Sequence, residues 1–319
     1  MVAAVLEVID IRVDYATPGG VAKAVDRVDF SLARGEFLGI VGESGCGKST
    51  LLFAIAQLLS PPAQLTAGQV LFKGQDMVRL TAQALRAGRW RDYSVVMQSA
   101  MNALNPVKTI GAQYDDVMRA HGQSDRRKIR ERSHEVLALV GIDAVHLKSF
   151  PHQLSGGMRQ RVMIAMALLL SPELIIMDEP TSALDVVAQR SLMVQIKELQ
   201  SRLGFAVIFV THDMSLVGHF SDRLAVMYAG KIVELGPTRE IFAAPKHPYT
   251  RGLLESFPSI YGPKVLLKGI PGAPPNLAAL PSGCRFHPRC ADVMPRCAAV
   301  EPALYDVGAS TVRCLLYDA

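Results

Sequence analysis

Gly42-Glu43-Ser44-Gly45-Cys46-Gly47-Lys48-Ser49-Thr50 is the stretch that decides the fold of this chain. It follows the apolar run Phe37–Val41, which predicts a buried strand, and it opens into Leu51–Ala56, which predicts a helix. A strand, a glycine-rich turn and a helix in this order are the context of a phosphate-binding loop. Glycines let backbone N–H groups turn inward around a polyanion, and the helix N-terminus adds partial positive charge. An ordinary glycine-rich turn is the alternative, but it does not explain the Lys-Ser pair in register.

The side chains of this loop predict a nucleotide site that uses magnesium. Lys48 is expected to reach the β- and γ-phosphates, and the Ser49 hydroxyl is expected to bind Mg²⁺. Tyr15 ends an alternating strand, where its ring could stack on adenine or simply pack. The other loop residues predicted to line the nucleotide are Gly42, Ser44, Gly45, Cys46, Gly47 and Thr50.

Length and composition predict a globular chain with a sizeable core. The 319 residues suggest two domains, or one large domain with an extension, and half of them are apolar. The net charge of +5 suits an anionic nucleotide but is too weak to argue for nucleic acid. Residues 6–10 alternate instead of forming a signal peptide, and the apolar run Val162–Leu170 is about half of a membrane span. We expect a cytosolic protein whose membrane role would come through a partner.

Apolar periodicity predicts an α/β fold. Helical periodicity with many charges, from residue 99 to about residue 172, predicts an all-helical insertion between strands. The predicted strands cover residues 5–15, 24–32, 37–41, 69–72, 93–97, 174–178 and 205–210, with a closing hairpin over 223–235.

Two of these buried strands end in residues that suit phosphate chemistry. Leu174–Met177 is followed by Asp178 and Glu179. Asp178 is expected to hold Mg²⁺ through water and Glu179 to polarise an attacking water, whereas the alternative is a strand capped by solvated acids. The strand over 205–210 is followed by His212, which could hydrogen-bond a γ-phosphate or serve a structural role.

A short segment before an apolar helix suggests a second anion-binding element. Ser155 is a candidate N-cap, and Gly156 and Gly157 let backbone N–H groups approach an anion closely. By itself a Ser-Gly-Gly sequence is a weak signal. Thr181–Asp185 starts a further helix that is predicted to run towards Leu203.

The order of these motifs resembles the ATP-binding subunit of ABC transporters over about residues 5–245. The resemblance rests on the phosphate loop, Gln98, Leu154–Gln160, Met177–Pro180, Ser182–Asp185 and His212. It implies the P-loop NTPase fold of an ABC ATPase core, with a mixed sheet that includes an antiparallel part and a helical insertion. In this core Lys48, Gln98, Glu179 and His212 are catalytic, and Ser49, Gln98 and Asp178 hold Mg²⁺. It also implies that ATP contacts Tyr15, Ser155, Gly156, Gly157, Gln160 and Asp185.

The family geometry implies partners. The Ser155-Gly156-Gly157 segment is expected to cap the nucleotide of a second ATPase subunit, because it cannot close over its own phosphate loop. Gln98 and residues 99–106 resemble the joint to a membrane-spanning subunit. Two permeases, a second and non-identical ATPase and an extracytoplasmic solute-binding protein are therefore expected, at the cytoplasmic face of a bacterial or archaeal membrane and without nucleic acid.

The tail narrows the resemblance to the oligopeptide and dipeptide import ATPases. Pro245–Leu253 and Gly283–Cys290 resemble the C-terminal extension of that subfamily. The chain is thus expected to divide into an ATPase domain, 1–245, and a small irregular extension, 246–319. The implied function is an ATPase motor for solute import, of peptides first, with oligosaccharides or nickel as alternatives. A soluble ABC ATPase acting on nucleic acid or ribosomes and an exporter subunit are the other classes considered.

Four cysteines in the tail predict a metal centre. Cys284, Cys290, Cys297 and Cys314 are separated by five, six and sixteen residues, and a cytosolic chain should not hold them as disulfides. The subfamily often carries an iron–sulfur cluster here, and a 4Fe-4S cluster of structural role is the first expectation. Zinc and free thiols are alternatives, although the Cys-x₂₋₄-Cys knuckles usual for zinc are absent. His287 is expected to pack or hydrogen-bond beside the thiols instead of binding metal.

Overall fold

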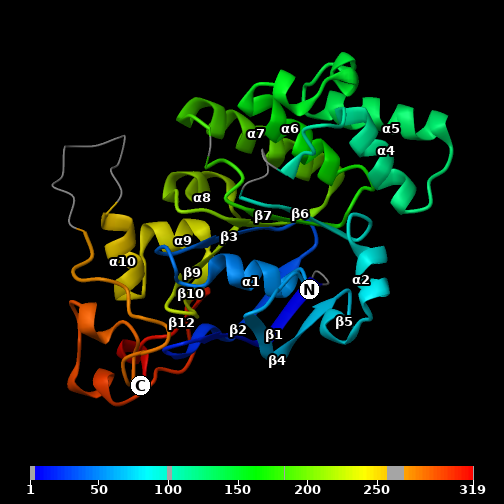
Figure 1. The fold of residues 1–319 in the computed structure, drawn as a ribbon. Coiled ribbons are helices and arrows are strands. Elements are labelled where there is room, and N and C mark those ends of the chain that lie inside the picture. The colour runs from blue at the N-terminus through cyan, green and yellow to red at the C-terminus, as the bar shows by residue number, and fades with distance from the viewer. Residues whose placement is uncertain (1–3, 99–102, 183, 257–268, 319) are drawn as a thin grey trace. The chain divides into compact units, whose positions relative to one another are not determined.

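The structure is a computed structural model that describes residues 4–98, 103–182, 184–256 and 269–318 (Figure 1). The chain divides into two compact units. The first unit contains Arg79–Phe209 with the short segment Ala33–Glu36, and the second contains Leu6–Leu32, Phe37–Val78 and the chain from Val210 onward. The predicted boundary at residue 245 stays a prediction. Residues 99–102 of the predicted insertion and joint, and Ala183, lie outside the described residues.

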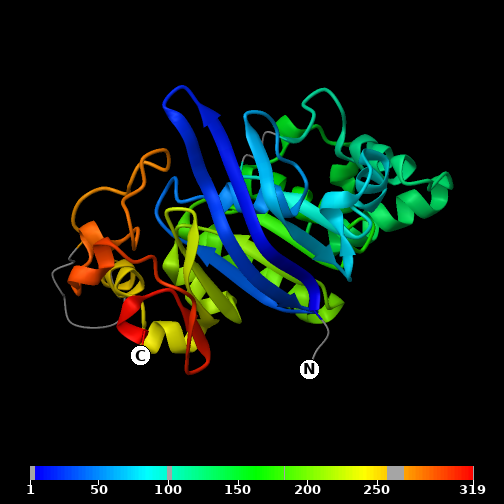
Figure 2. The same cartoon turned by 90° about the horizontal axis from the view of Figure 1, so that it is seen from below.

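A four-stranded sheet in the second unit has the order β2-β1-β4-β5. Its β1 and β2 are long, follow each other through a short turn and lie side by side (Figure 2). In β1, Leu6 and Val8 are buried in alternation, and after a register shift so are Ile11 and Val13, which confirms the predicted half-buried strand. The strands are β1 (Ala4–Thr17), β2 (Gly20–Ala33), β4 (Ala63–Phe72) and β5 (Gln75–Asp76).

The second unit also contributes strands in the order β11-β12-β10-β9-β3. β3 and β9 are parallel, and β9, β10, β12 and β11 pair antiparallel. The tail therefore adds a hairpin to the core, with Val312 opposite Glu234, where the sequence predicted irregular structure. Strands of three residues are too short to show alternation. The bounds are β3 (Phe37–Val41), β9 (Arg223–Tyr228), β10 (Lys231–Pro237), β11 (Tyr305–Val307) and β12 (Ser310–Val312).

The helices of the second unit include one that starts on the phosphate loop. The bounds are α1 (Lys48–Ile55), α8 (Met214–Phe220), α9 (Thr238–Ala243) and α10 (Pro248–Glu255). Short 3₁₀ turns in the tail cover His287–Arg289, Pro295–Ala298 and Leu315–Tyr317.

Three strands of the first unit have the order β8-β7-β6. β6 and β7 run parallel, with Val96 opposite Met177. Every residue of β7 and β8 is buried, as their continuous apolar sequences predict. The bounds are β6 (Tyr93–Val96), β7 (Leu174–Asp178) and β8 (Ala206–Val210).

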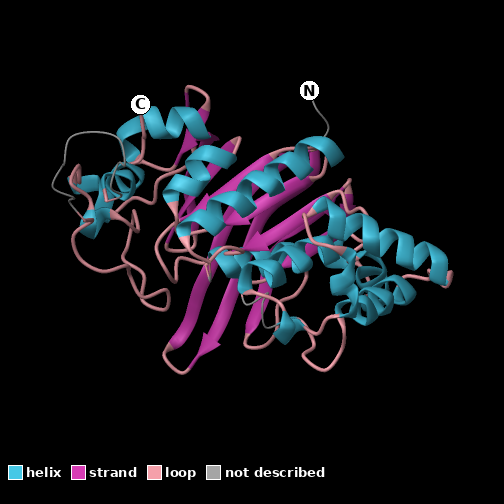
Figure 3. Cartoon of the chain, turned by 90° about the horizontal axis from the view of Figure 1, so that it is seen from above, coloured by secondary structure: helices cyan, strands magenta, loops and turns pink. Residues whose placement is uncertain are grey.

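Between β6 and β7 the described chain is helix and loop, which agrees with the predicted insertion (Figure 3). The buried Tyr114 hydroxyl of α4 donates to the carbonyl oxygen of Val162 in α6 at 2.7 Å, which ties these helices together. The helices of this unit are α2 (Ala82–Gly88), α4 (Ile110–Ala120), α5 (Arg126–Leu139), α6 (Gly156–Ala167) and α7 (Val186–Leu203). Within the described part of the chain, no helix combines the length and apolarity that crossing a bilayer requires.

Candidate active site

The phosphate loop in the second unit needs glycine at two positions. Gly42 and Gly47 have φ angles of 153° and 106°, and Gly47 immediately precedes α1. A Cβ atom on Gly42 would lie 2.2 Å from the carbonyl oxygen of Met227, and one on Gly47 would lie 2.0 Å from that of Ala24. The loop is thus packed against the backbone of neighbouring strands, and only glycine fits both the space and the conformation.

The side chains that were predicted to bind phosphate begin α1. The buried Lys48 ammonium donates to the carbonyl oxygens of Gly42 at 2.8 Å and Glu43 at 3.0 Å, so it lies within the loop. Ser49 and Thr50 are half-buried in the first turn. The hydroxyls of Tyr15 and Thr50 are 3.1 Å apart, which places the predicted adenine-stacking residue at the same helix N-terminus.

His212 belongs to the second unit and lies near the strand that leads into the loop. The Thr211 N–H donates to the carbonyl oxygen of Ile40 in β3 at 3.3 Å, so the exposed His212 follows directly beside this strand end. Asp213 then caps α8 by accepting from the Ser215 N–H at 2.8 Å. Contact of His212 with a γ-phosphate stays a prediction.

In the first unit, strand register brings Gln98 and Glu179 together. Because Val96 lies opposite Met177 in parallel strands, the residues two positions later emerge at the same sheet edge. The Gln98 amide donates to the Glu179 carboxylate at 2.8 Å. The intervening Asp178 is buried, with 2% of its surface exposed.

Glu179 also has an unusual backbone. Its φ angle of 44° lies in the left-handed region, which costs a non-glycine residue on the order of 1–3 kcal/mol. The preceding strand is regular, so the turn comes at the residue that was predicted to act as base. Strain of this kind is concentrated at functional sites, which makes Glu179 the first candidate for a catalytic role in this unit.

The Ser-Gly-Gly segment forms the start of α6. The helix begins at Gly156, and the exposed Ser155 caps it by accepting from the Met158 N–H at 3.3 Å, which confirms the predicted N-cap. A Cβ on Gly157 would meet no atom within 4 Å, so this face of the first turn is open.

The remaining predicted nucleotide contacts of the first unit differ in their exposure. Gln160 is buried, with 4% of its surface exposed. Asp185 caps α7 by accepting from the Ala188 N–H at 2.9 Å. Contact of these residues with ATP stays a prediction.

Sequence reasoning missed two tail residues that contact the phosphate loop. Arg289 donates to both carboxylate oxygens of Glu43, at 2.7 and 2.9 Å. The Tyr249 hydroxyl accepts from the Glu43 N–H at 2.9 Å. These contacts join residues 246 and 206 positions apart, so no local sequence signal announces them.

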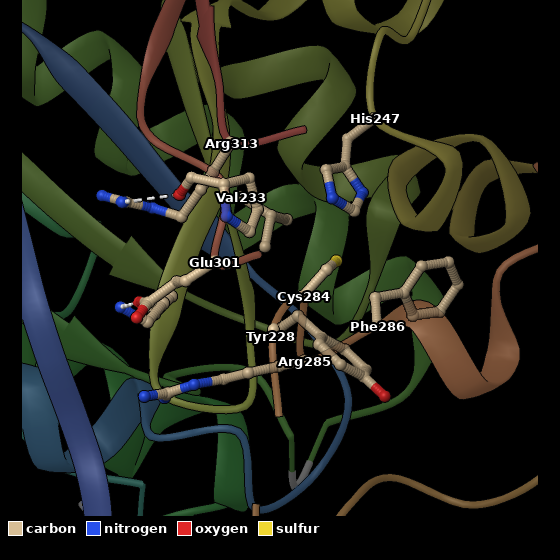
Figure 4. Close-up of a pocket in the computed structure, with 11 residues that line it drawn as sticks. Tyr228, Val233, His247, Cys284, Arg285, Phe286, Glu301 and Arg313 are labelled. Atoms are coloured by element: carbon tan, nitrogen blue, oxygen red, sulfur yellow. Dashed lines mark hydrogen bonds and ion pairs between the residues drawn. The ribbon is translucent and has the colours of Figure 1, made fainter. Parts of the chain in front are cut away.

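A buried cluster of charges joins the tail to β2 and β10. Lys231 lies 3.1 Å from Asp26, Arg285 donates to Asp26, and Glu301 pairs with Lys231. Burial by itself would raise the pKa of Asp26, but Lys231 and Arg285 hold that pKa below its ordinary value. In Figure 4, Arg285 and Glu301 extend to one side of the pocket that they share with Phe286.

The four tail cysteines line one pocket of the second unit as free thiols. Burial raises the pKa values of Cys284 and Cys314, and it raises that of Cys290 to about 11, so these thiols are neutral at pH 7. His287 donates from Nδ1 to the Cys284 carbonyl oxygen at 2.9 Å, as its predicted hydrogen-bonding role requires.

Two observations of the structure bear on the predicted metal centre. Four cysteines on one pocket are a suitable donor set for iron–sulfur or zinc. However, in the described ranges no three His, Cys, Asp or Glu side chains are grouped so that they could hold a metal ion.

Two family models match separate stretches of the chain. Residues 25–182 match the family model described as ABC transporter, and residues 233–297 match that described as oligopeptide/dipeptide transporter, C-terminal region. The chain is 43% identical over 318 residues to the dipeptide transport ATP-binding protein DppD of Bacillus subtilis, covering 98% of this chain and 95% of the relative. It is 42% identical to the oligopeptide transport ATP-binding protein OppD of the same organism, covering 96% and 87%.

Solved structures of an ABC transporter cassette are similar to most of the chain. A dimeric bacterial ABC transporter cassette superposes with a TM-score of 0.66 at 28% identity, covering 73% of this chain and 99% of the cassette. The post-hydrolysis state of that cassette, bound to ADP and phosphate, also has a TM-score of 0.66, at 29% identity and the same coverage.

Proposed function

Because this chain belongs to the ABC transporter family of ATPases, we propose that it is the ATP-hydrolysing motor subunit of a peptide importer. The observation that carries the proposal is similarity over the whole chain, tail included, to proteins named for dipeptide and oligopeptide transport. Oligosaccharide or nickel import by the same motor is the alternative, since the ATPase subunit does not touch the solute.

In the proposed reaction, Lys48 and the loop N–H groups bind the β- and γ-phosphates of ATP. Mg²⁺, when bound, offsets phosphate charge, and Ser49, Gln98 and Asp178 are the residues that would hold it. Glu179 acts as the general base toward water. The 2.8 Å hydrogen bond from Gln98 to Glu179 supports this role, because it orients the carboxylate.

The remaining site residues complete the proposed ATP contacts. Tyr15 stacks on adenine and His212 contacts the γ-phosphate. The open, serine-capped N-terminus of α6 binds the nucleotide held by a second ATPase subunit. Binding of ATP then closes two subunits, and hydrolysis releases them.

The proposed assembly contains a second, non-identical ATPase, two permeases and an extracytoplasmic solute-binding protein. The chain carries one copy of each motif, so a complete ATP site needs another subunit. The motor would act at the cytoplasmic face of a bacterial or archaeal membrane. Nucleic acid has no part in this function.

Reconstitution with the permeases in lipid vesicles tests the proposal. A dipeptide or tetrapeptide presented with the binding protein should stimulate ATP hydrolysis, and Glu179→Gln should abolish that stimulation. Stimulation of ATP hydrolysis only by an oligosaccharide or only by Ni²⁺ would instead favour one of the alternative solutes. Stable binding of DNA or ribosomes, without permease-dependent hydrolysis, would overturn the transport role.

We further propose that the tail thiols bind a 4Fe-4S cluster, with zinc as the alternative metal. The support is the shared pocket of the four cysteines. Purified protein should contain iron and sulfide and absorb visible light, and Cys284→Ser should lose both. Cys46→Ser is the matched control, since Cys46 lies in the phosphate loop. One bound zinc per colourless chain, or no metal, would overturn the cluster.

A further inference from the structure

Glu43 places a negative charge in the loop that cradles a polyanion. It is the one acidic residue of the stretch from Gly42 to Thr50. An unpaired carboxylate there would repel the phosphates of ATP and weaken binding. The chemistry of the loop therefore requires that this charge be neutralised.

Arg289 neutralises Glu43 from the C-terminal tail. Its two hydrogen bonds to the carboxylate, at 2.7 and 2.9 Å, form a bidentate pair. The arginine side chain is 6% exposed and the glutamate side chain 25% exposed, so water screens the pair weakly. The two charges of such a pair therefore interact more strongly than those of a salt bridge at the surface.

Contacts other than those with Glu43 also hold the Arg289 side chain in position. Its Nε donates to the carbonyl oxygen of Pro271 at 2.8 Å, and its guanidinium lies over the Tyr228 ring at 5.8 Å from the centroid. Phe286, one turn earlier, packs edge-on against Tyr228 and Tyr249, with ring centroids 5.1 and 5.4 Å away. The arginine thus loses little freedom when it binds Glu43.

The same glutamate links the tail to Lys48. Tyr249, fully buried, accepts from the Glu43 N–H, while the Glu43 carbonyl oxygen accepts from the Lys48 ammonium at 3.0 Å. Fixing the carboxylate and the N–H of Glu43 therefore fixes the carbonyl that holds the lysine. The tail therefore influences the geometry of the phosphate-binding lysine through a single residue, Glu43.

We propose that Arg289 is a positioning residue for the phosphate loop, which it orients and neutralises through Glu43, so that the tail is part of the ATP-binding apparatus. The proposal rests on the ATP-binding function of this loop. It assigns the tail a role in nucleotide affinity.

The test is Mg²⁺-ATP binding by the full-length chain, measured by titration calorimetry well below the melting temperature. Arg289→Ala should raise the Kd by roughly tenfold, the loss expected for one charge-assisted contact, and should raise KM more than it lowers kcat. Arg289→Lys should recover part of the affinity. Arg251→Ala is the matched control, because Arg251 pairs with Asp292 in an exposed position of the same tail.

A second variant separates charge from structure. Glu43→Gln removes the negative charge and keeps the side-chain shape, so the double variant Arg289→Ala with Glu43→Gln should bind ATP more tightly than Arg289→Ala alone. Without such recovery, or with ATP affinity unchanged in Arg289→Ala while its melting temperature falls, the positioning role is wrong. If the unmodified chain fails to bind ATP, the ATPase function fails as well.

Discussion

The phosphate loop and the Gln98–Glu179 sheet edge both carry a glutamate, but the two glutamates are held in different ways. Glu179 receives its hydrogen bond from the neighbouring parallel strand, and register alone brings the two side chains to one edge. Glu43 is held by residues 206 and 246 positions away in the tail. The position of Glu179 follows from two motifs on neighbouring strands. The position of Glu43, by contrast, requires that the tail be folded against the phosphate loop.

This difference shows that residues outside a recognisable motif help to fix the position of its backbone and side chains. The loop supplies the chemical groups, but Met227, Ala24 and Arg289 decide where its backbone and its charge lie. We therefore expect variants at the sheet edge to affect turnover and variants around the loop to affect nucleotide binding or stability.

The largest effect is expected at the sheet edge. Glu179→Gln should lower kcat by about 10²–10⁴-fold, the usual contribution of a general base, and should retain ATP binding because no phosphate-binding group is lost. Glu173→Gln, immediately before the other end of the same strand, is the matched control and should hydrolyse ATP normally. Undiminished hydrolysis by Glu179→Gln in steady-state assays would remove Glu179 from the base role.

A smaller but still severe effect is expected in the loop backbone. Gly47→Ala should lower the free energy of unfolding by more than about 2 kcal/mol, since it combines a left-handed backbone with a contact of 2.0 Å. Gly157→Ala meets no atom within 4 Å and should lose no stability. Urea unfolding of both variants measures the contrast, and equal losses would show that packing does not select glycine at position 47.

The tail that supports the loop should be sensitive to acid. His247 is buried, caps α10 by accepting from the Tyr249 N–H at 3.0 Å, and has its pKa lowered by burial to about 3. The unfolded chain binds a proton near pH 6.5 and the folded chain does not, so the free energy of unfolding should fall by about 2 kcal/mol from pH 7 to pH 5.

Replacing that histidine isolates its contribution. Asparagine can cap the helix but does not titrate in this range, so His247→Asn should flatten the decline between pH 7 and pH 5 by the same amount. The measurement is urea unfolding at several pH values. If the free energy of unfolding of the variant falls as steeply between pH 7 and pH 5 as that of the unmodified chain, groups other than His247 cause the acid sensitivity.

The smallest effect is expected at a purely local contact. Ser155→Ala removes the cap of α6 and should cost about 1 kcal/mol of stability, whereas Ser155→Asn restores a capping oxygen and should cost much less. Thermal unfolding of the pair distinguishes them. Equal destabilisation would mean that the cap does not control where α6 begins.

Most of the local structure could be predicted from the chain. Apolar runs located β3, β7 and β8 because both faces of these strands are buried, and alternation located β1 because one face is. The start of α6 could be predicted because Ser155 is a typical capping residue, although the first turn that follows it is polar. The hairpin of β11 and β12 was missed because each strand has only three residues.

The sequence by itself determined the chemistry of this protein: the glycines, lysine and serine of the phosphate loop, the acids after β7 and the capped Ser-Gly-Gly turn. These signals are local, because each depends only on the residue types and their spacing along one strand or helix. Only the tertiary structure decided that Arg289 neutralises Glu43 and that the Tyr249 hydroxyl accepts from the Glu43 N–H. Such pairings depend on how distant segments pack, and no short-range periodicity encodes them.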